Sequence, residues 1–333
     1  MFDFIPTEYF LLIFGFILLI KGGDWFVDAA CGIAKRFHLP ELLIGATVVS
    51  IGTTLPEVMT SAIGAMSGAS EIAYGNAIGS IICNTSLIAA VTIAIKPAKV
   101  ERKTLIFPVI FFFAIAVFYS LNAYLLGGFA LWAGIILLVA FVAYMIINVI
   151  NMKKNPASPE MVELEEAEVV EVSNAGLIKD IAMLLAGALV IAVGAYLLVE
   201  NATIIAEQLG VPQSVIGLTV VALGTSLPEL VTAITSLVKG HGALSLGNII
   251  GANIFNFVLV SGVAITISPF TVPLSSTLFG MNASFILDIP VMFAVMAIMT
   301  LPPLFKGKLQ RWQGISLLAI YVTYLVMQFV FVA

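Results

Sequence analysis

The sequence contains very little charge. Only 10% of its 333 residues are Asp, Glu, Lys or Arg, whereas 61% are hydrophobic, and the mean hydropathy is +1.14. A soluble domain could not cover its surface with so few charged residues, so the composition predicts a polytopic membrane protein. The hydrophobic runs are continuous and do not alternate with polar residues, which excludes a transmembrane β-barrel.

Residues that build disulfides and hydrolytic sites are also scarce. The two cysteines, Cys31 and Cys83, fall in or near hydrophobic runs, and we interpret them as small buried apolar residues and not as a disulfide. The two histidines, His38 and His241, lie at expected loop positions, and neither HExxH nor GxSxG occurs. The sequence therefore argues against an intramembrane enzyme. It indicates no cofactor and no nucleic-acid partner.

Ten hydrophobic runs have the length of a membrane-spanning helix, so we expect an all-α protein in a lipid bilayer. The first run follows no basic segment, which favours a transmembrane helix over a cleaved signal peptide. The predicted spans are 9–34, 40–66, 71–95, 104–122, 126–150, 177–206, 212–238, 243–268, 280–301 and 312–332.

The basic residues are distributed unevenly between the loops. Thirteen of the 14 Lys and Arg residues fall in alternate loops, which the positive-inside rule assigns to the cytoplasm. This predicts a multi-pass protein of a prokaryotic plasma membrane, with both termini outside. The remaining one, Lys21, lies inside the first span, and its spacing from Asp24 predicts a local ion pair.

A polar stretch at 151–176 divides the chain into an N-terminal five-helix half, 1–150, and a C-terminal five-helix half, 177–333. The stretch holds six glutamates and would be cytoplasmic. About 26 residues are too few for a domain with its own core, so a solvated linker is the simpler interpretation. A regulatory cation-binding segment is the alternative.

The two halves contain a repeated sequence. Gly45–Ile88 and Gly217–Val260 align without gaps, 172 residues apart, with 18 of 44 positions identical. Because five spans separate the copies, the second copy must be inverted in the membrane, and such inverted repeats are typical of secondary transporters. At the same offset, three earlier residues also match, namely Gly15 with Gly187, Gly22 with Gly194, and Pro40 with Pro212.

Each repeat contains a proline-broken helix rich in oxygen ligands. Pro56 has no N–H, so the carbonyl of Gly52 loses its helical partner, and the ring crowds the backbone at Thr53. Thr53 and Thr54 add hydroxyls and Glu57 adds a carboxylate, which completes a ligand set for hard cations. The second copy repeats this set as Gly224, Thr225, Ser226, Leu227, Pro228 and Glu229.

A carboxylate in the middle of a span costs at least about 2.5 kcal/mol, so Glu57 and Glu229 mark a functional site. A polar stripe accompanies each broken helix at i, i+4, i+8 spacing, and a GxxxG pair in each stripe permits close helix packing. The two asparagines that begin the stripes could instead serve only to hold helices together. The stripes are Asn76, Ser80 and Asn84, and Asn248, Ala252 and Asn256.

These motifs resemble the α-repeats of the cation/Ca²⁺ exchanger superfamily, and among them the prokaryotic Na⁺/Ca²⁺ antiporters. The resemblance is carried by GTTLPE with GNAIGSIICN and by GTSLPEL with GNIIGANIFN, and it extends over all ten spans. It implies eight core helices, with the first and sixth slanting across them and sliding to alternate access. It also implies four cation sites between the second, third, seventh and eighth helices, one for Ca²⁺ and the others for Na⁺.

The resemblance further implies a role for each matching residue. Glu57 and Glu229 would be the central Ca²⁺ ligands and would also bind Na⁺. Thr53 and Thr225 would offer carbonyls and hydroxyls, and Ser50 and Ala222 backbone carbonyls to the outermost Na⁺ sites. The remaining side-chain ligands would be the hydroxyls of Thr54, Ser226 and Ser80 and the amide of Asn84.

Two positions depart from the family pattern. Asn256 stands where some members have Asp, and Ala252 where many have Ser. Two glutamates neutralise one Ca²⁺ or two Na⁺, so the absence of a third carboxylate argues against three Na⁺ per Ca²⁺. In K⁺-dependent members of the family an Asp occupies the position of Asn256, so the resemblance also argues against K⁺ co-transport. Ala252 removes one hydroxyl, so the two ends of the site should bind Na⁺ unequally.

Three functions remain compatible with the sequence. Ca²⁺/Na⁺ antiport is favoured because the hydroxyls beside the two glutamates provide more oxygen ligands than a proton carrier needs. H⁺/Ca²⁺ exchange is the close alternative, since intramembrane carboxylates also carry protons. A channel is a further alternative, against which the paired inverted repeats argue.

Overall fold

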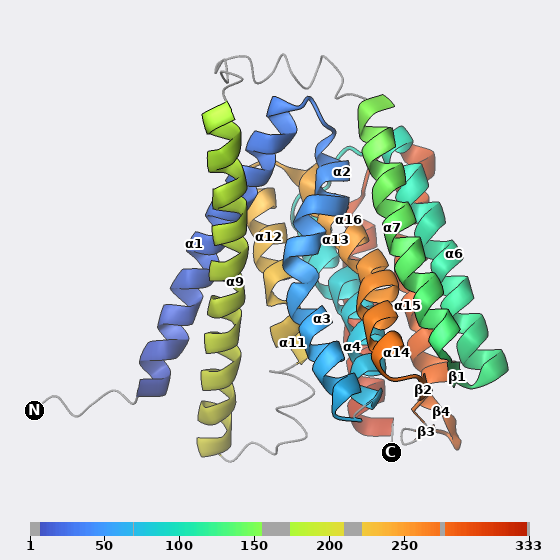
Figure 1. The fold of residues 1–333 in the computed structure, drawn as a ribbon. Coiled ribbons are helices and arrows are strands. Elements are labelled where there is room, and N and C mark those ends of the chain that lie inside the picture. The colour runs from blue at the N-terminus through green and yellow to red at the C-terminus, as the bar shows by residue number, and fades with distance from the viewer. Residues whose placement is uncertain (1–6, 69, 155–173, 210–221, 274–276, 332–333) are drawn as a thin grey trace, which may run out of the picture.

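The computed structural model describes residues 7–68, 70–154, 174–209, 222–273 and 277–331. Within these ranges the protein is a bundle of long helices, with only two-residue strands at one end (Figure 1). The helices of the N-terminal half are α1 (Thr7–Arg36), α2 (Glu41–Ile44), η1 (Gly45–Val49), α3 (Ser50–Met66), α4 (Ser70–Cys83), η2 (Asn84–Ala89), α5 (Ala90–Ile95), α6 (Arg102–Leu126) and α7 (Leu131–Lys154).

The C-terminal half repeats this order of long and short helices. Its helices are α9 (Asn174–Gln208), α11 (Ala222–Thr225), α12 (Leu227–Val238), α13 (Gly242–Phe255), η4 (Asn256–Ser261), α14 (Gly262–Ile267), η5 (Ser284–Asp288), α15 (Ile289–Lys306), α16 (Arg311–Val326) and η6 (Met327–Phe331). The η segments are π-helical turns. Strand β1 (Gly128–Phe129) pairs with β2 (Phe270–Thr271), and β3 (Thr277–Leu278) with β4 (Met281–Asn282).

Nine helical stretches of the described chain are long and apolar enough to cross a membrane, and α12 is a shorter apolar helix. The prediction of an all-α, multi-span fold is confirmed. The span predicted at 212–238 is described from residue 222 onward, and its first part lies outside the described residues. Some boundaries differ from the prediction by four or five residues. The helix predicted at 104–122 continues to Leu126, the next begins at Leu131, and the span predicted at 280–301 lies at Ser284–Lys306.

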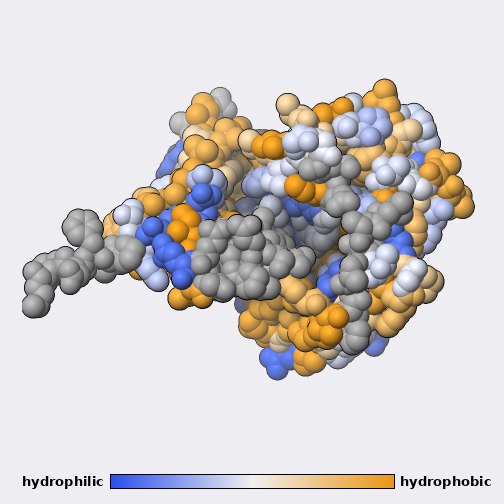
Figure 2. All heavy atoms as spheres, turned by 90° about the horizontal axis from the view of Figure 1, so that it is seen from below, coloured by the Kyte–Doolittle hydropathy of each residue, from blue (hydrophilic) through white to orange (hydrophobic). Residues whose placement is uncertain are grey.

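The connections that carry the basic residues lie at one end of the bundle. In Figure 1 the ends of α1, α7 and α15 and the starts of α6 and α9 are all at the top, whereas the strands lie at the bottom. Seen from below, hydrophilic residues surround a hollow near the middle of the lower face, and hydrophobic residues gather around the outside (Figure 2). The division at 151–176 stays a prediction, because residues 155–173 lie outside the described residues.

Helices α1 and α9 run antiparallel beside each other (Figure 1). A Cβ on Gly15 would lie 2.9 Å from the carbonyl oxygen of Gly194, and a Cβ on Gly187 would lie 3.0 Å from that of Gly22. Gly15 thus packs against Gly194, which is the equivalent of Gly22, and Gly22 packs against Gly187, which is the equivalent of Gly15. This reciprocity is what a two-fold axis between inverted repeats produces.

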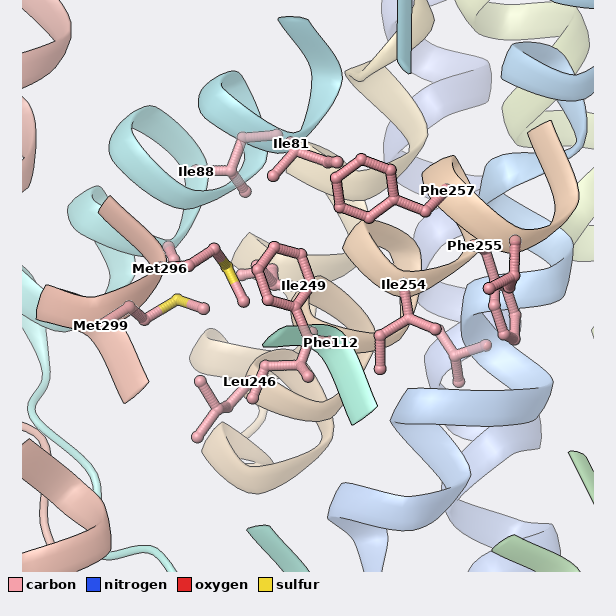
Figure 3. Close-up of a cluster of buried hydrophobic side chains, with 14 of the residues drawn as sticks. Ile81, Ile88, Phe112, Leu246, Ile249, Ile254, Phe255, Phe257, Met296 and Met299 are labelled. Carbon is pink, nitrogen blue, oxygen red and sulfur yellow. The ribbon is translucent and has the colours of Figure 1, made fainter. Parts of the chain in front are cut away.

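Helix α13 lies at the centre of the bundle, surrounded by other helices. In the most apolar stretch of the span that contains it, 83% of the residues are buried. Figure 3 shows its apolar side chains among those of α4, η2, α6 and α15. Its GxxxG glycines face α2 and η1, where a Cβ on Gly247 would overlap Leu42 and one on Gly251 would lie 2.6 Å from Ala46 Cα. The predicted close helix approach is thus confirmed for the second copy.

The predicted Lys21–Asp24 pair is wrong. Asp24 instead contacts Lys239, with 3.3 Å between Oδ1 and Nζ, and Lys239 also lies 2.7 Å from Asp28. Partial burial lowers the pKa of Lys239, but the hydrogen bonds and charges of Asp28 and Asp24 outweigh it and hold the pKa above its usual range. Local spacing could not reveal this pairing, because Lys239 lies more than 200 residues away in sequence.

Replacing Gly187 with leucine is expected to separate α1 from α9. The new side chain would enter the backbone of α1 at Phe26, so we expect a loss of about 1–3 kcal/mol, seen as a lower Tm of the purified protein in detergent. Ala186→Leu is the matched control, because Ala186 is exposed on the same helix. Equal melting temperatures for the two variants would contradict the tight crossing.

Candidate cation site

The two repeated motifs lie on helices that change pitch where the motif residues occur. Asn84 begins the π-helical turn η2, and Asn256, the equivalent residue of the second copy, begins η4. Such turns are rare and are frequently found at functional sites. The sequence showed the asparagines but not the turns, because nothing in the apolar pattern distinguishes a π turn from an α turn.

The proline-containing helices differ between the two copies. The prediction that Pro56 breaks its helix is wrong, because α3 runs without interruption from Ser50 to Met66. A proline removes one hydrogen bond, at the carbonyl of Gly52, and the flanking bonds keep the helix intact. In the second copy the helix is interrupted at Ser226, and Pro228 lies in the first turn of α12, where proline is tolerated.

The two glutamates of the motifs are fully buried and face the same space. Glu57 and Glu229 are both 0% exposed. The hydroxyl of Thr54 donates a long hydrogen bond of 3.5 Å to Glu229 Oε1 across the two halves. Because Thr54 and Glu57 are three residues apart on α3, they lie on one helix face. The two carboxylates thus come from inverted helices to a common centre.

Neither glutamate has a basic partner in the described part of the chain. Uncompensated negative charge is costly to bury, so this arrangement needs a cation or a proton from outside the protein. The ion pairs among the described residues are Arg36 with Asp180, Lys239 with Asp24 and Asp28, and His241 with Glu41.

Two asparagines connect the halves in reciprocal fashion. The hydroxyl of Thr53 donates to Asn248 Oδ1 at 3.2 Å, and that of Thr225 donates to Asn76 Oδ1 at 3.5 Å. Asn76 also donates to the backbone carbonyl of Glu57 at 3.2 Å. Asn76 and Asn248 therefore connect the helices that carry the carboxylates, and whether they also bind ions stays a prediction.

Sequence reasoning missed the residues that orient these asparagines. Asn76 Nδ2 donates to Ser61 Oγ at 2.8 Å, and Asn248 Nδ2 donates to Thr232 Oγ1 at 2.9 Å. Ser61 is four residues after Glu57, and Thr232 is three after Glu229, so each lies one turn from its glutamate. A polar residue one turn beyond an intramembrane carboxylate was the signal that could have found them.

Several buried polar atoms around the glutamates have no hydrogen-bond partner in the described part of the protein. Buried polar groups are nearly always partnered, so such a concentration points to a ligand. The unpartnered atoms are both carboxylate oxygens of Glu57, Oε2 of Glu229, Oγ of Ser226, and the amide oxygens and nitrogens of Asn84 and Asn256.

The remaining predicted site residues flank this centre. Ser50 is buried, and its hydroxyl lies 2.7 Å from the carbonyl of Gly45 and 2.9 Å from that of Asn248. Ser80 is buried one turn before Asn84, whereas the equivalent Ala252 offers no hydroxyl. Ala222 begins α11, directly after residues outside the described ranges. The two ends of the site therefore differ in oxygen content.

The glycines of the two motifs bring α1 and α9 close to the site. A Cβ on Gly52 would lie 2.8 Å from the ring of Phe26 in α1, and one on Gly224 would overlap Val199 in α9. A crevice too narrow to hold a water molecule lies between these helices and the site, and its lining includes Thr53, Pro56 and Pro228. The α1–α9 pair thus covers the oxygen-rich centre.

The arrangement suits hard cations. Carboxylate, hydroxyl, amide and carbonyl oxygens are the ligands that Ca²⁺ and Na⁺ prefer. Two carboxylates supply two negative charges, which one divalent or two monovalent cations neutralise. A single centre of this kind therefore makes the two classes of cation compete.

Comparison with known proteins gives concordant results. The family model described as sodium/calcium exchanger protein matches residues 7–150 and 179–330. The solved structure of the sodium-calcium exchanger NCX_Mj, in a crystal soaked with Na⁺ and Sr²⁺, superposes with a TM-score of 0.82 at 31% identity, covering 97% of this chain and 99% of that one.

Proteins of similar sequence include named ion exchangers and antiporters. The "Putative antiporter CaxA" of Alkalimonas amylolytica is 33% identical over 324 residues, which are 93% of this chain and 95% of that protein. The sodium/calcium exchanger MaX1 of Methanosarcina acetivorans is 40% identical over 97 residues, and this match spans only 28% of its length. An uncharacterized membrane protein of Methanocaldococcus jannaschii matches at 48% identity over 30% of its length.

Replacing Asn248 with alanine is expected to loosen the connection between the two halves. It would remove the acceptor of Thr53 and the donor to Thr232, both buried, so we expect a loss of about 1–3 kcal/mol in a thermal melt. Asn122→Ala is the matched control, since the Asn122 amide nitrogen donates only within α6, to Phe118. A smaller loss for Asn248→Ala than for Asn122→Ala would refute this role.

Proposed function

The chain belongs to the sodium/calcium exchanger protein family, whose model matches both halves of it, and on this premise we propose that it exchanges Ca²⁺ for Na⁺ by alternating access. One observation of this structure carries the proposal. Two fully buried carboxylates, one from each inverted half, meet without a basic partner among the described residues. Cations from solution are the chemistry that such a centre requires.

Competition for the same two glutamates makes the protein an exchanger. One Ca²⁺ or two Na⁺ leave the centre neutral, whereas an empty centre would bury two negative charges. The loaded forms are therefore the ones in which the site can be enclosed and pass from one side to the other. With Asn256 in place of a third carboxylate, the charge balance favours two Na⁺ for each Ca²⁺.

We assign the ligands from their positions around the centre. Glu57 and Glu229 bind Ca²⁺ directly and also serve Na⁺. Thr53 and Thr225 contribute carbonyl oxygens, since their hydroxyl protons are donated to the two asparagines. The further ligands proposed are the hydroxyls of Thr54, Ser226 and Ser80, the carbonyls of Ser50 and Ala222, and the amides of Asn84 and Asn256.

Access to the centre requires α1 and α9 to move. Both helices lie over the site, and the crevice beneath them is too narrow for a hydrated ion. Glycines on each helix let α1 and α9 pack closely against each other, so the pair can move over the site as a unit. We place the protein in the plasma membrane of a prokaryote, with the basic connections inside and both termini outside.

Glu57→Gln or Glu229→Gln is expected to abolish exchange. Either change removes one charge from a buried pair, so Ca²⁺ in the centre would leave an uncompensated positive charge. In proteoliposomes, Na⁺-gradient-driven ⁴⁵Ca uptake should fall to the level of protein-free vesicles. Glu101→Gln, on an exposed glutamate between α5 and α6, is the matched control and should retain uptake. Near-normal uptake in either central variant would refute the assignment.

The identity of the coupling ion can be tested separately. With Na⁺, K⁺ and H⁺ gradients imposed one at a time, the Na⁺ gradient alone should drive ⁴⁵Ca uptake at equal pH on both sides. The hydroxyl-rich surroundings of the glutamates provide the oxygen ligands that Na⁺ needs. Uptake driven by the pH gradient alone would instead identify an H⁺/Ca²⁺ exchanger that uses the same two carboxylates.

A further inference from the structure

A second group of metal-ligating side chains lies away from the central site. Cys31 of α1, Glu41 at the start of α2 and His241 just before α13 each place one ligand atom within 4.8 Å of the other two. The three residues come from three separate elements at the same end of the bundle (Figure 1). Neither the repeat motif nor the exchange of Ca²⁺ for Na⁺ accounts for this group.

Local structure explains how these side chains meet. Cys31 lies on the buried face of α1, and Pro40, in an extended conformation, directs the chain so that Glu41 begins α2. Gly240 has a φ of +90°, which glycine adopts easily, and it turns the chain before His241. The backbone N–H of His241 donates to the Ser236 carbonyl at 2.7 Å, which anchors this turn to α12.

The cluster is enclosed on one side and accessible on the other. The cysteine is 5% exposed, whereas the side chains of His241 and Glu41 are 17% and 23% exposed. His241 Nδ1 lies 2.6 Å from Glu41 Oε1, so these two ligand atoms already face each other.

We propose that Cys31, Glu41 and His241 bind Zn²⁺ at a site separate from the transported cations. Thiolate, imidazole and carboxylate are the ligands that Zn²⁺ prefers, whereas Ca²⁺ and Na⁺ take oxygen alone. A tetrahedral Zn²⁺ with bonds of about 2.0–2.3 Å sets its ligand atoms about 3.3–3.8 Å apart, so small side-chain rotations suffice. Binding releases the thiol proton to solution.

Zn²⁺ at this position would fasten α1 to the rest of the bundle. Cys31 belongs to α1, and Glu41 and His241 belong to α2 and to the connection between α12 and α13. Lys239, two residues before His241, already contacts Asp24 and Asp28 of α1. The proposed exchange requires α1 to slide, so Zn²⁺ should slow exchange without entering the central site. This effect on exchange rests on the proposed function.

Co²⁺ is the spectroscopic probe for this site. The binding test uses purified protein carrying Glu57→Gln and Glu229→Gln, so that the central site no longer presents its carboxylates. We expect one Co²⁺ per chain, with a thiolate charge-transfer band in the near ultraviolet that excess Ca²⁺ does not remove. Cys31→Ser should abolish the band, and His241→Gln should weaken binding at least about tenfold. Cys83→Ser, at the other buried cysteine, should retain the band.

The outcomes separate this inference from the proposed function. A band that persists in Cys31→Ser, or no band in any variant, would overturn the Zn²⁺ site even if Na⁺-driven uptake is normal. A band that follows Cys31 would support the site even if no gradient drives uptake. In the protein with intact glutamates, Zn²⁺ should raise the Tm and slow ⁴⁵Ca uptake, and both effects should be absent in Cys31→Ser. Equal slowing in Cys31→Ser would overturn the fastening of α1.

Discussion

The rest of the structure depends on the burial of two carboxylates in a medium that cannot solvate them. Glu57 and Glu229 are completely enclosed, and no basic side chain of the described chain approaches them. A fixed Lys or Arg there would neutralise the charge permanently and leave nothing to exchange. Without such a residue, mobile ions have to neutralise the two carboxylates. The net charge of the site then depends on which ion is bound.

Pseudo-two-fold symmetry brings the carboxylates together. Two sets of contacts recur crosswise: glycines between α1 and α9, and threonine–asparagine hydrogen bonds around the site. In both sets, equivalent residues of the two repeats pack against each other. The two repeats also share a π-helical turn, at Asn84 and at Asn256. The two repeats also differ in places. Ser80 is equivalent to Ala252, and the uninterrupted α3 is equivalent to the interrupted α11–α12. At these positions the site differs between the two sides of the membrane.

The sequence predicted the parts of this arrangement that depend on composition and local spacing. The membrane spans, the inverted repeat and the intramembrane carboxylates follow from hydropathy and from a motif that occurs twice. Contacts between distant residues could not be predicted in the same way. The bonds of Thr53 to Asn248 and of Asp24 to Lys239 depend on how helices pack, and the helix through Pro56 depends on flanking bonds that outweigh one lost donor. Which of the surrounding oxygens bind ions stays a prediction.

Division of the site between the halves also governs how the protein is made. Glu57 leaves the ribosome 172 residues before Glu229, so the first half enters the bilayer while its partner ligands do not yet exist. During that interval Glu57 is best tolerated as a neutral acid, surrounded by the apolar residues of its own helix. Glu229 joins it only when the second half inserts in the opposite orientation. The centre with two carboxylates therefore cannot form before both halves are in the membrane, and neither half contains it alone.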